Sequence, residues 1–158
     1  MAVLIMKMLI DADSCPKQAR DLVTRRAVKM GIRIIFAANR PIPASEDVDP
    51  NFIEMEVCSN TDDSADNRIV ELSEKGDLAI TRDIGLAKRL IEKQVSVIDD
   101  RGRLFTANNI NELLSLRNFT VGLADNGLDF ERTPNYGKKE LKQFADSFDR
   151  VLTKLNSL

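Results

Sequence analysis

Apolar positions along the chain alternate between short continuous runs and longer stretches with helical spacing. Residues 3–10 form an apolar run bounded by polar residues, which is typical of a strand buried on both faces of a sheet. Apolar residues then recur every three or four positions as far as Gly31, and this spacing predicts a helix with Ser14 as its N-cap and Pro16 in its first turn. The same alternation predicts further strands at 32–38, 54–58, 77–81 and 95–98, and further helices at about 64–75 and 84–93.

The pattern after residue 105 is helical. Thr106 is the expected cap of one helix, and apolar positions from Leu141 to Leu155 predict a last helix after a polar stretch at about 125–137. Strands that alternate with helices predict an α/β fold, in which helices cover both faces of a mostly parallel sheet of about five strands. We expect one domain over 1–158, with an α/β core (1–105) and C-terminal helices (106–158) packed on the same domain.

Composition narrows the chemistry that the chain can perform. The 158 residues contain no His, which excludes a Ser-His-Asp triad, a His general base and a His metal ligand. Two Cys are too few for a secreted disulfide scaffold, and no segment approaches the ~20 apolar residues of a membrane span. We therefore expect a cytoplasmic protein with no membrane partner. The net charge of −2 does not indicate a strongly basic surface for nucleic acid.

Carboxylates follow the predicted strands at the points where these strands end. Asp11 and Asp13 follow the first strand, Asp83 follows the strand at 77–81, and Asp99 and Asp100 follow the strand at 95–98. Because the carboxyl ends of parallel strands share one edge of a sheet, we expect these side chains to face the same crevice.

Asp66 adds a carboxylate from a helix. It lies between Ile69 and Val70 on the helical wheel, and therefore inside or beside the buried stripe, with Asp63 one turn earlier and Asn67 beside it. A buried carboxylate needs a cation, hydrogen-bond donors or a metal. Several acids in one crevice repel each other, and Mg²⁺ or Mn²⁺ relieves this repulsion with oxygen ligands.

Each of these acids also has a simpler structural interpretation. Asp11, Asp13 and Asp63 could serve only as helix caps, and Asp99 and Asp100 could serve only as turn residues. The coincidence of several acids at one edge favours a site. Cys15 is interpreted as a packed small residue, because no His is available as its base.

The motifs around these acids resemble those of the bacterial YaiI/YqxD family of uncharacterised proteins. The resemblance covers residues 11–16 (DADSCP), 63–67 (DSADN) and 76–83 (GDLAITRD), and it continues to the last helix. That family resembles PIN/NYN-type domains, which implies a PIN-like three-layer fold and a metal-dependent nuclease. By this likeness the matching acids would be Asp11, Asp63 or Asp66, Asp83, and Asp99 or Asp100.

The first functional hypothesis is a Mg²⁺- or Mn²⁺-dependent ribonuclease or phosphodiesterase that acts on RNA. Its expected catalytic residues are Asp11, Asp66 and Asp83. The expected metal-binding residues are Asp11, Asp13, Asp63, Asp66, Asp83 and Asp99. The expected substrate-binding residues are Ser14, Asn67, Thr81, Arg101 and Arg103. The two arginines follow the last strand of the core and would contact phosphate at the same edge as the acids.

Two other hypotheses remain open. Asp11 and Asp13 have the spacing of the nucleophile and acid of a haloacid-dehalogenase-type phosphatase, although the later motifs of that class match poorly. A non-catalytic binding or regulatory module with a PIN-like fold is the third hypothesis. The oligomeric state is also open, and a homodimer is compatible with the sequence.

Overall fold

A six-stranded mixed sheet forms the centre of the molecule. The computed structural model describes residues 7–43, 46–59, 61, 64–125 and 135–156. Strand order in the sheet is β3-β2-β1-β4-β5-β6, and every pair is parallel except β5 with β6. The strands are β1 (Lys7–Asp11), β2 (Arg33–Ala38), β3 (Ile53–Val57), β4 (Leu78–Ile80), β5 (Ser96–Ile98) and β6 (Leu104–Phe105).

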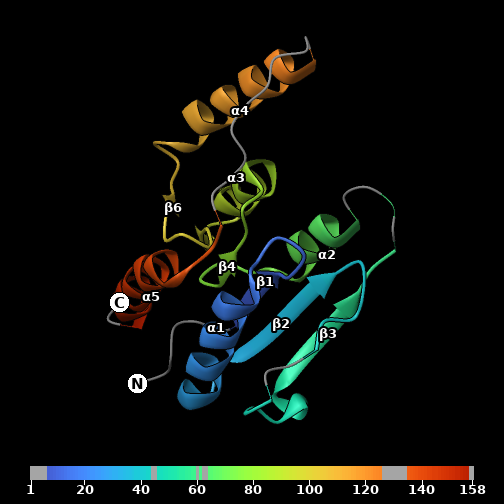
Figure 1. Cartoon of the computed structure of the whole chain (residues 1–158), viewed down its shortest axis with the longest axis vertical. Helices are drawn as coiled ribbons and strands as arrows, with labels where there is room; N and C mark the ends of the chain where they lie inside the picture. Colours follow the sequence, from blue (N-terminus) through green and yellow to red (C-terminus); the bar gives the residue numbers. More distant parts are fainter. Residues whose placement is uncertain (1–6, 44–45, 60, 62–63, 126–134, 157–158) are drawn as a thin grey trace.

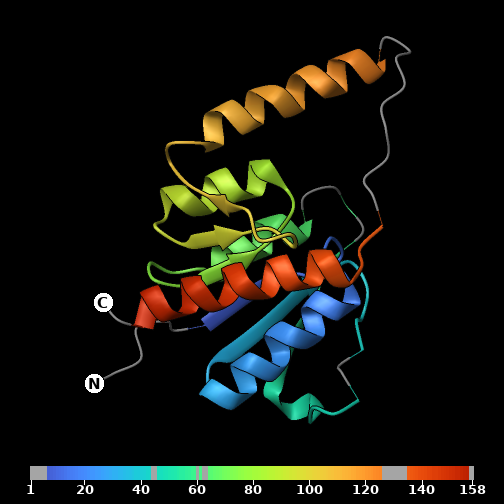
Figure 2. The same cartoon turned by 60° about the vertical axis from the view of Figure 1, so that its left-hand side comes forward.

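Helices cover both faces of this sheet, which confirms the expected α/β architecture (Figure 1). On one face, α1 (Lys17–Met30) and α5 (Lys138–Asn156) lie side by side (Figure 2). On the other face lie α2 (Ser64–Leu72) and α3 (Ile84–Glu92). Next to α3 lies α4 (Ile110–Asp125), and a 3-10 turn, η1 (Pro50–Phe52), precedes β3. None of the described helices is long and apolar enough to cross a membrane.

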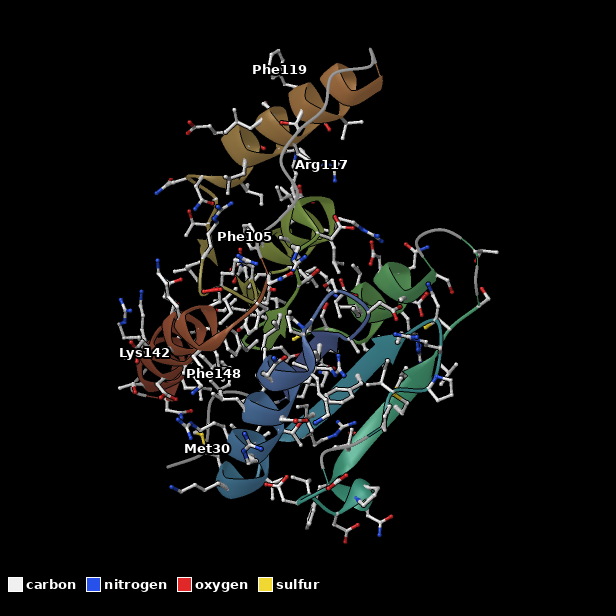
Figure 3. All side chains as sticks on the ribbon, in the orientation of Figure 1. Met30, Phe105, Arg117, Phe119, Lys142 and Phe148 are labelled. Atoms are coloured by element: carbon white, nitrogen blue, oxygen red, sulfur yellow. The ribbon has the colours of Figure 1, made fainter. Side chains whose placement is uncertain are left out.

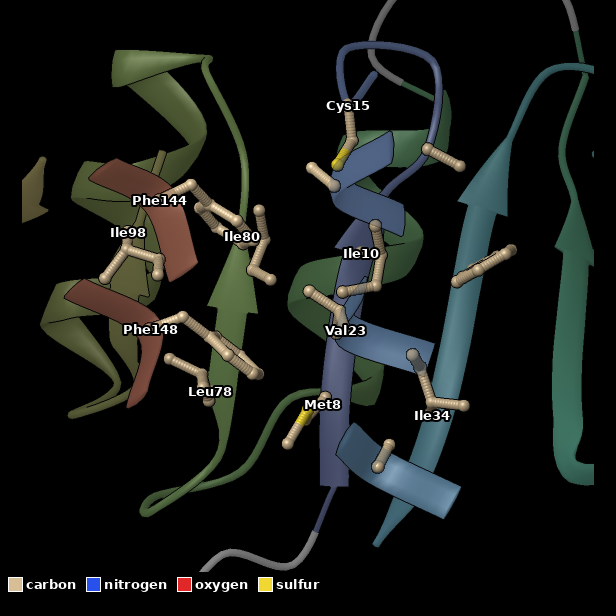
Figure 4. Close-up of a cluster of buried hydrophobic side chains, with 14 of the residues drawn as sticks. Met8, Ile10, Cys15, Val23, Ile34, Leu78, Ile80, Ile98, Phe144 and Phe148 are labelled. Atoms are coloured by element: carbon tan, nitrogen blue, oxygen red, sulfur yellow. The ribbon is translucent and has the colours of Figure 1, made fainter. Parts of the chain in front are cut away.

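The two faces of the sheet have separate hydrophobic cores because successive side chains of a strand point to opposite faces. Met8 and Ile10 of β1 point toward α1 and α5, whereas Leu9 points toward α2 and α3. Phe144 and Phe148 of α5 are fully buried over β4, with ring centroids 5.6 Å apart (Figure 4). The C-terminal helix is therefore part of the core, as its apolar spacing predicts.

The order in which the chain adds strands to the sheet reverses between β1 and β4. It passes from β1 to β2 and β3 on one side, and α2 then returns it to β4 on the other side of β1. In open α/β sheets, a crevice forms at the carboxyl ends of the two strands that flank such a reversal. Here these ends carry Asp11 and the segment that begins at Thr81.

Three local details differ from the expected elements. Helix α1 begins at Lys17, so Pro16 occupies the N-cap position and the Ser14 side chain does not cap the helix. Helix α2 ends at Leu72, earlier than expected. The short antiparallel strand β6 adds a sixth strand that the apolar pattern does not predict.

Thr106, the expected cap, closes the turn that leads into α4, and the helix itself begins at Ile110. The Thr106 and Asn109 side chains each accept a hydrogen bond from the backbone N–H of the other residue. Further along this helix the side chain of Phe119 is 65% exposed and points away from the body of the molecule, whereas Arg117 points toward α3 (Figure 3). Helix α4 therefore contacts the body along one side only.

Candidate functional site

Asp11 is the central carboxylate of the carboxyl edge. It is the last residue of β1 and is 7% exposed. Its Oδ2 atom accepts hydrogen bonds from two hydroxyl groups, those of Ser14 at 2.9 Å and Thr81 at 2.8 Å. Both donors bind the same oxygen, and Oδ1 accepts no hydrogen bond from the described residues. The second oxygen is thus available to a ligand.

Thr81 connects Asp11 to Asp83. Its hydroxyl donates to Asp11 Oδ2 and accepts a hydrogen bond of 3.0 Å from the backbone N–H of Asp83. The side chain of Thr81 is buried, and its backbone N–H donates to the carbonyl of Ile98 on β5. One buried hydroxyl therefore sets the position of the first carboxylate relative to the turn that carries the second.

Asp83 is the N-cap of α3. Its Oδ1 atom accepts a hydrogen bond of 3.2 Å from the backbone N–H of Leu86, and Arg117 Nη1 lies 3.7 Å from the same oxygen. Among the described residues, Oδ2 has no such partner. Asp83 thus repeats the arrangement of Asp11, in which protein donors hold one oxygen and leave the other available.

The electrostatics of Asp11 are those of a crowded acidic site. Burial raises its pKa, and the charges of Asp83 and Asp13 raise the pKa further, while the hydrogen bonds from Thr81 and Ser14 lower it. The net direction is upward from the ordinary value of 3.8. Ionised Asp11 is therefore held at a free-energy penalty that a bound cation would relieve.

The other predicted acids have different environments. Asp13 is exposed, and its Oδ2 accepts a hydrogen bond of 2.9 Å from the backbone N–H of Asn39, at the end of β2. Asp66 is half-buried in the first turn of α2, which packs on β1 and β2 and begins at the same edge. Asn67 is exposed on that helix. Asp63 lies outside the described residues.

Asp99 and Asp100 organise the turn between β5 and β6. Asp99 Oδ1 accepts hydrogen bonds from the backbone N–H groups of Arg101 and Arg103, at 2.9 and 2.8 Å. Asp100 is 2% exposed and forms a two-point ion pair with Arg82. The described contacts of both acids are thus those of turn and ion-pair residues, and they follow β5, which is one strand from β4 and two strands from β1.

Arg82, Arg117 and Tyr136 belong to this edge but are not predicted by the motif analysis. Arg82 lies between Thr81 and Asp83, and its backbone N–H donates to the Ser14 hydroxyl at 3.4 Å. Tyr136 donates a hydrogen bond of 2.7 Å to the Asp100 carbonyl. An arginine next to an acid is the only sequence signal for Arg82, and nothing in the helical pattern distinguishes Arg117 from other exposed cations.

Cys15 is a packed residue, as its surroundings in the sequence predict. It is 3% exposed, and its carbonyl accepts a hydrogen bond of 2.6 Å from Arg20. Burial, followed by the negative charge of Asp100, raises the pKa of its thiol to about 12. A thiol with this pKa is protonated at neutral pH and is not a nucleophile.

The available oxygens of Asp11 and Asp83 fit one particular kind of metal binding. No three Cys, Asp or Glu side chains within the described ranges come together as a group that could hold a metal ion. Mg²⁺, however, is usually bound by one or two carboxylates and completes its shell with water and substrate phosphate oxygens. Asp11 and Asp83 could supply such carboxylate ligands, because one oxygen of each has no hydrogen-bond partner among the described residues.

Together these observations define a doubly wound α/β domain with a carboxylate pair at its topological switch point. The chain belongs to the YaiI/YqxD family, because the model of the family described as "Uncharacterized BCR, YaiI/YqxD family" matches residues 9–154. The resemblance in the motifs is thereby confirmed.

Curated relatives support the same assignment along nearly the whole chain. A UPF0178 protein of Treponema denticola is 47% identical over 149 residues, which cover 94% of this chain and 93% of the relative. A UPF0178 protein of Treponema pallidum is 44% identical over 95% of this chain and 83% of its own length. A UPF0178 protein of Pseudomonas aeruginosa is 40% identical, with 95% and 92% covered. No solved structure matches the chain significantly.

Proposed function

We propose that the protein is a Mg²⁺- or Mn²⁺-dependent ribonuclease whose cation is held by Asp11 and Asp83. The observation that carries this proposal is the Thr81 hydroxyl, which donates to Asp11 and accepts from the backbone N–H of Asp83. With Asp11 held through Oδ2 and Asp83 held by the Leu86 N–H through Oδ1, one oxygen of each carboxylate has no partner among the described residues. A divalent cation, when bound, supplies positive charge for the phosphoryl oxygens and lowers the pKa of a bound water.

The residues around the carboxylates have distinct roles in this proposal. Thr81 and Ser14 orient Asp11 through its Oδ2 atom, so that Oδ1 faces the ligand. The N–H of Leu86 holds Asp83 in the same way. Arg117, 3.7 Å from Asp83, would supply a cationic group for the substrate phosphate. Asp66 and Asp13 are assigned as auxiliary acids of the edge, whereas Asp99 is assigned to the β5–β6 turn.

The phosphatase hypothesis is the weaker alternative because the later motifs of that class match the sequence poorly. In that mechanism Asp11 is the nucleophile, and the second acid donates a proton to the leaving group. Here Ser14, Cys15 and Pro16 follow the second acid, and Gly76-Asp77 precedes its strand β4, whereas that class has a Gly-Asp pair after a strand.

The direct test is cleavage of a labelled single-stranded RNA pool by the purified protein with Mn²⁺. We expect weak cleavage that EDTA abolishes and that Asp11→Asn and Asp83→Asn variants lack. Glu54→Gln is a matched control, because it also replaces a carboxylate by an amide, but in an exposed pair with Arg33 at the opposite edge of the sheet. Activity that survives EDTA or Asp83→Asn would identify a contaminating nuclease and refute the proposal.

Metal binding can be measured independently of cleavage. A cation that binds only the folded protein at 100 times its Kd stabilises the protein by about 2.7 kcal/mol. We expect Mn²⁺ to raise the Tm of the wild type and of Glu54→Gln, but not of Asp83→Asn. Absence of saturable Mn²⁺ binding at millimolar concentration would support the non-catalytic module. Phosphate release from small phosphomonoesters without RNA cleavage would support the phosphatase.

A further inference from the structure

A second feature of the carboxyl edge is a recess of about 480 Å³ between the β5–β6 turn and α5. Three of its lining side chains are arginines, Arg101 and Arg103 from the turn and Arg150 from the helix. Arg101 and Arg103 follow β5 directly, whereas Arg150 comes from a helix nearly fifty residues further along the chain. Only the packing of α5 on this face of the sheet brings the three together.

The recess has rigid walls. Gly102 has a φ of +89°, and a Cβ atom at this position would lie 2.8 Å from the backbone oxygen of Gln143 on α5. The Ser147 hydroxyl donates a hydrogen bond of 2.6 Å to the Gly102 carbonyl. The Asp99 side chain also stabilises the turn, because it accepts hydrogen bonds from two backbone N–H groups of the turn. The turn is thus fixed against the helix without a ligand, which reduces the entropy lost on binding.

The charges around the recess leave an excess of positive charge. Asp99 is engaged by two backbone N–H groups, and Asp146 pairs with Lys142 at 2.9 Å. The side chains of Arg103 and Arg150 form no hydrogen bond or ion pair with any residue in the described ranges. Both arginines line the recess, and the donors of their guanidinium groups are therefore available to solvent or to a ligand.

We propose that this recess binds one phosphate group of a single-stranded nucleic acid, with Arg103 and Arg150 as the principal ligands. The guanidinium group presents paired N–H donors that match phosphate oxygens. This inference rests on the proposed ribonuclease function, because it makes the recess a second phosphate position of the same substrate. It also makes α5 part of the substrate-binding surface.

The position of the recess agrees with a single-stranded RNA that crosses the carboxyl edge of the sheet. The recess follows the end of β5, and β4, its neighbour, ends at the turn that carries Asp83. Neighbouring strands lie about 4.8 Å apart. A single-stranded RNA with one phosphate at Asp11 and Asp83 would place a nearby phosphate at the recess, on the side of the sheet that α5 covers.

The experiment measures fluorescence anisotropy of a labelled single-stranded RNA in EDTA and low salt, so that no cleavage occurs. We expect Arg103→Ala and Arg150→Ala each to weaken binding about tenfold. The slope of log K against log salt should become shallower by about 0.7 in each variant. Arg89→Ala is the matched control, because Arg89 is an exposed arginine in the last turn of α3, at the opposite edge.

Each outcome of this experiment is decisive. Equal affinities in all four proteins, equal losses in all three variants, or no RNA binding by the wild type would overturn the proposal. A nucleoside monophosphate is titrated in parallel. Its arginine-dependent binding, with RNA affinity unchanged in the variants, would assign the recess to free nucleotides and overturn the strand proposal. Arginine-dependent RNA binding in a protein that cleaves no RNA would refute the ribonuclease function but support phosphate binding at the recess.

Discussion

Replacement of Asp11 by Asn should stabilise the protein at neutral pH while it removes metal binding. Burial and the charges of Asp83 and Asp13 together outweigh the two hydroxyl hydrogen bonds, so the folded state raises the pKa of Asp11. Asn retains one side-chain oxygen that can accept from both Ser14 and Thr81. The variant therefore loses the penalty of the buried charge but keeps the geometry that the two hydroxyls define.

The expected gain follows the sign of the pKa shift. The folded protein binds the Asp11 proton more tightly than the unfolded chain, so stability falls as pH rises from 3.8 through the raised pKa, and the penalty is greatest above that pKa. Removal of a functional-site charge of this kind typically raises the free energy of unfolding by about 0.5–2 kcal/mol. At about 2–4 °C per kcal/mol for a chain of this size, Tm should rise by about 1–8 °C.

Thermal unfolding with EDTA, followed by circular dichroism between pH 4 and pH 7.5, measures this difference. The Tm of Asp11→Asn should exceed that of the wild type at pH 7.5, and the gap should narrow as pH falls toward 4. Addition of Mn²⁺ should raise the Tm of the wild type alone and so reduce or reverse the gap. A less stable Asp11→Asn protein in EDTA at pH 7.5, or a gap independent of pH, would refute the reasoning.

Three further variants or treatments test other parts of the structure. Lys7→Met should destabilise the protein by about 3–5 kcal/mol, because it leaves the fully buried Asp77, 2.8 Å from the Lys7 ammonium, without its counter-charge; urea unfolding measures this, and a loss below 1 kcal/mol would contradict it. Gly102→Ala should destabilise by at least about 1–3 kcal/mol, since Ala is strained at a φ of +89° and its Cβ would clash with α5; an unchanged Tm would show that the turn can move. Iodoacetamide at pH 8 should alkylate the half-buried Cys58 in the folded protein and Cys15, with its pKa of about 12, only after unfolding, as peptide mapping would show; rapid labelling of Cys15 would contradict the packed assignment.

The strands at the centre of the sheet can be predicted from the sequence because they are buried on both faces. Continuous apolar runs at β1 and β4 predict strands buried on both faces, and the acids that follow them indicate the carboxyl edge of the sheet. The strand β6 is missed because two residues, Leu104 and Phe105, carry no periodicity. Its pairing depends on a turn that Asp99 organises by hydrogen bonds, which a pattern of apolar residues does not encode.

The residues that complete the candidate site are harder to predict for a different reason. The hydrogen bond from Thr81 to Asp11 joins residues seventy positions apart and requires the register that pairs Ile10 with Ile80. Asp83 is recognisable as an acid after a strand, but the approach of Arg117 depends on how α4 packs on α3. Lateral register and helix packing are tertiary properties, and a single sequence carries only weak signals for either.

The burial of α5 over the first and fourth strands has a consequence for synthesis on the ribosome. Phe144 and Phe148 cover β1, β4 and β5, yet they are translated more than forty residues after the last of these strands. Until α5 leaves the exit tunnel, the apolar face that contains Met8 and Ile80 is covered by α1 alone. At a translation rate of about 5–20 residues per second, this face lacks α5 for several seconds. Nascent chains stalled before residue 138 should therefore bind chaperones, and chains released with α5 complete should not.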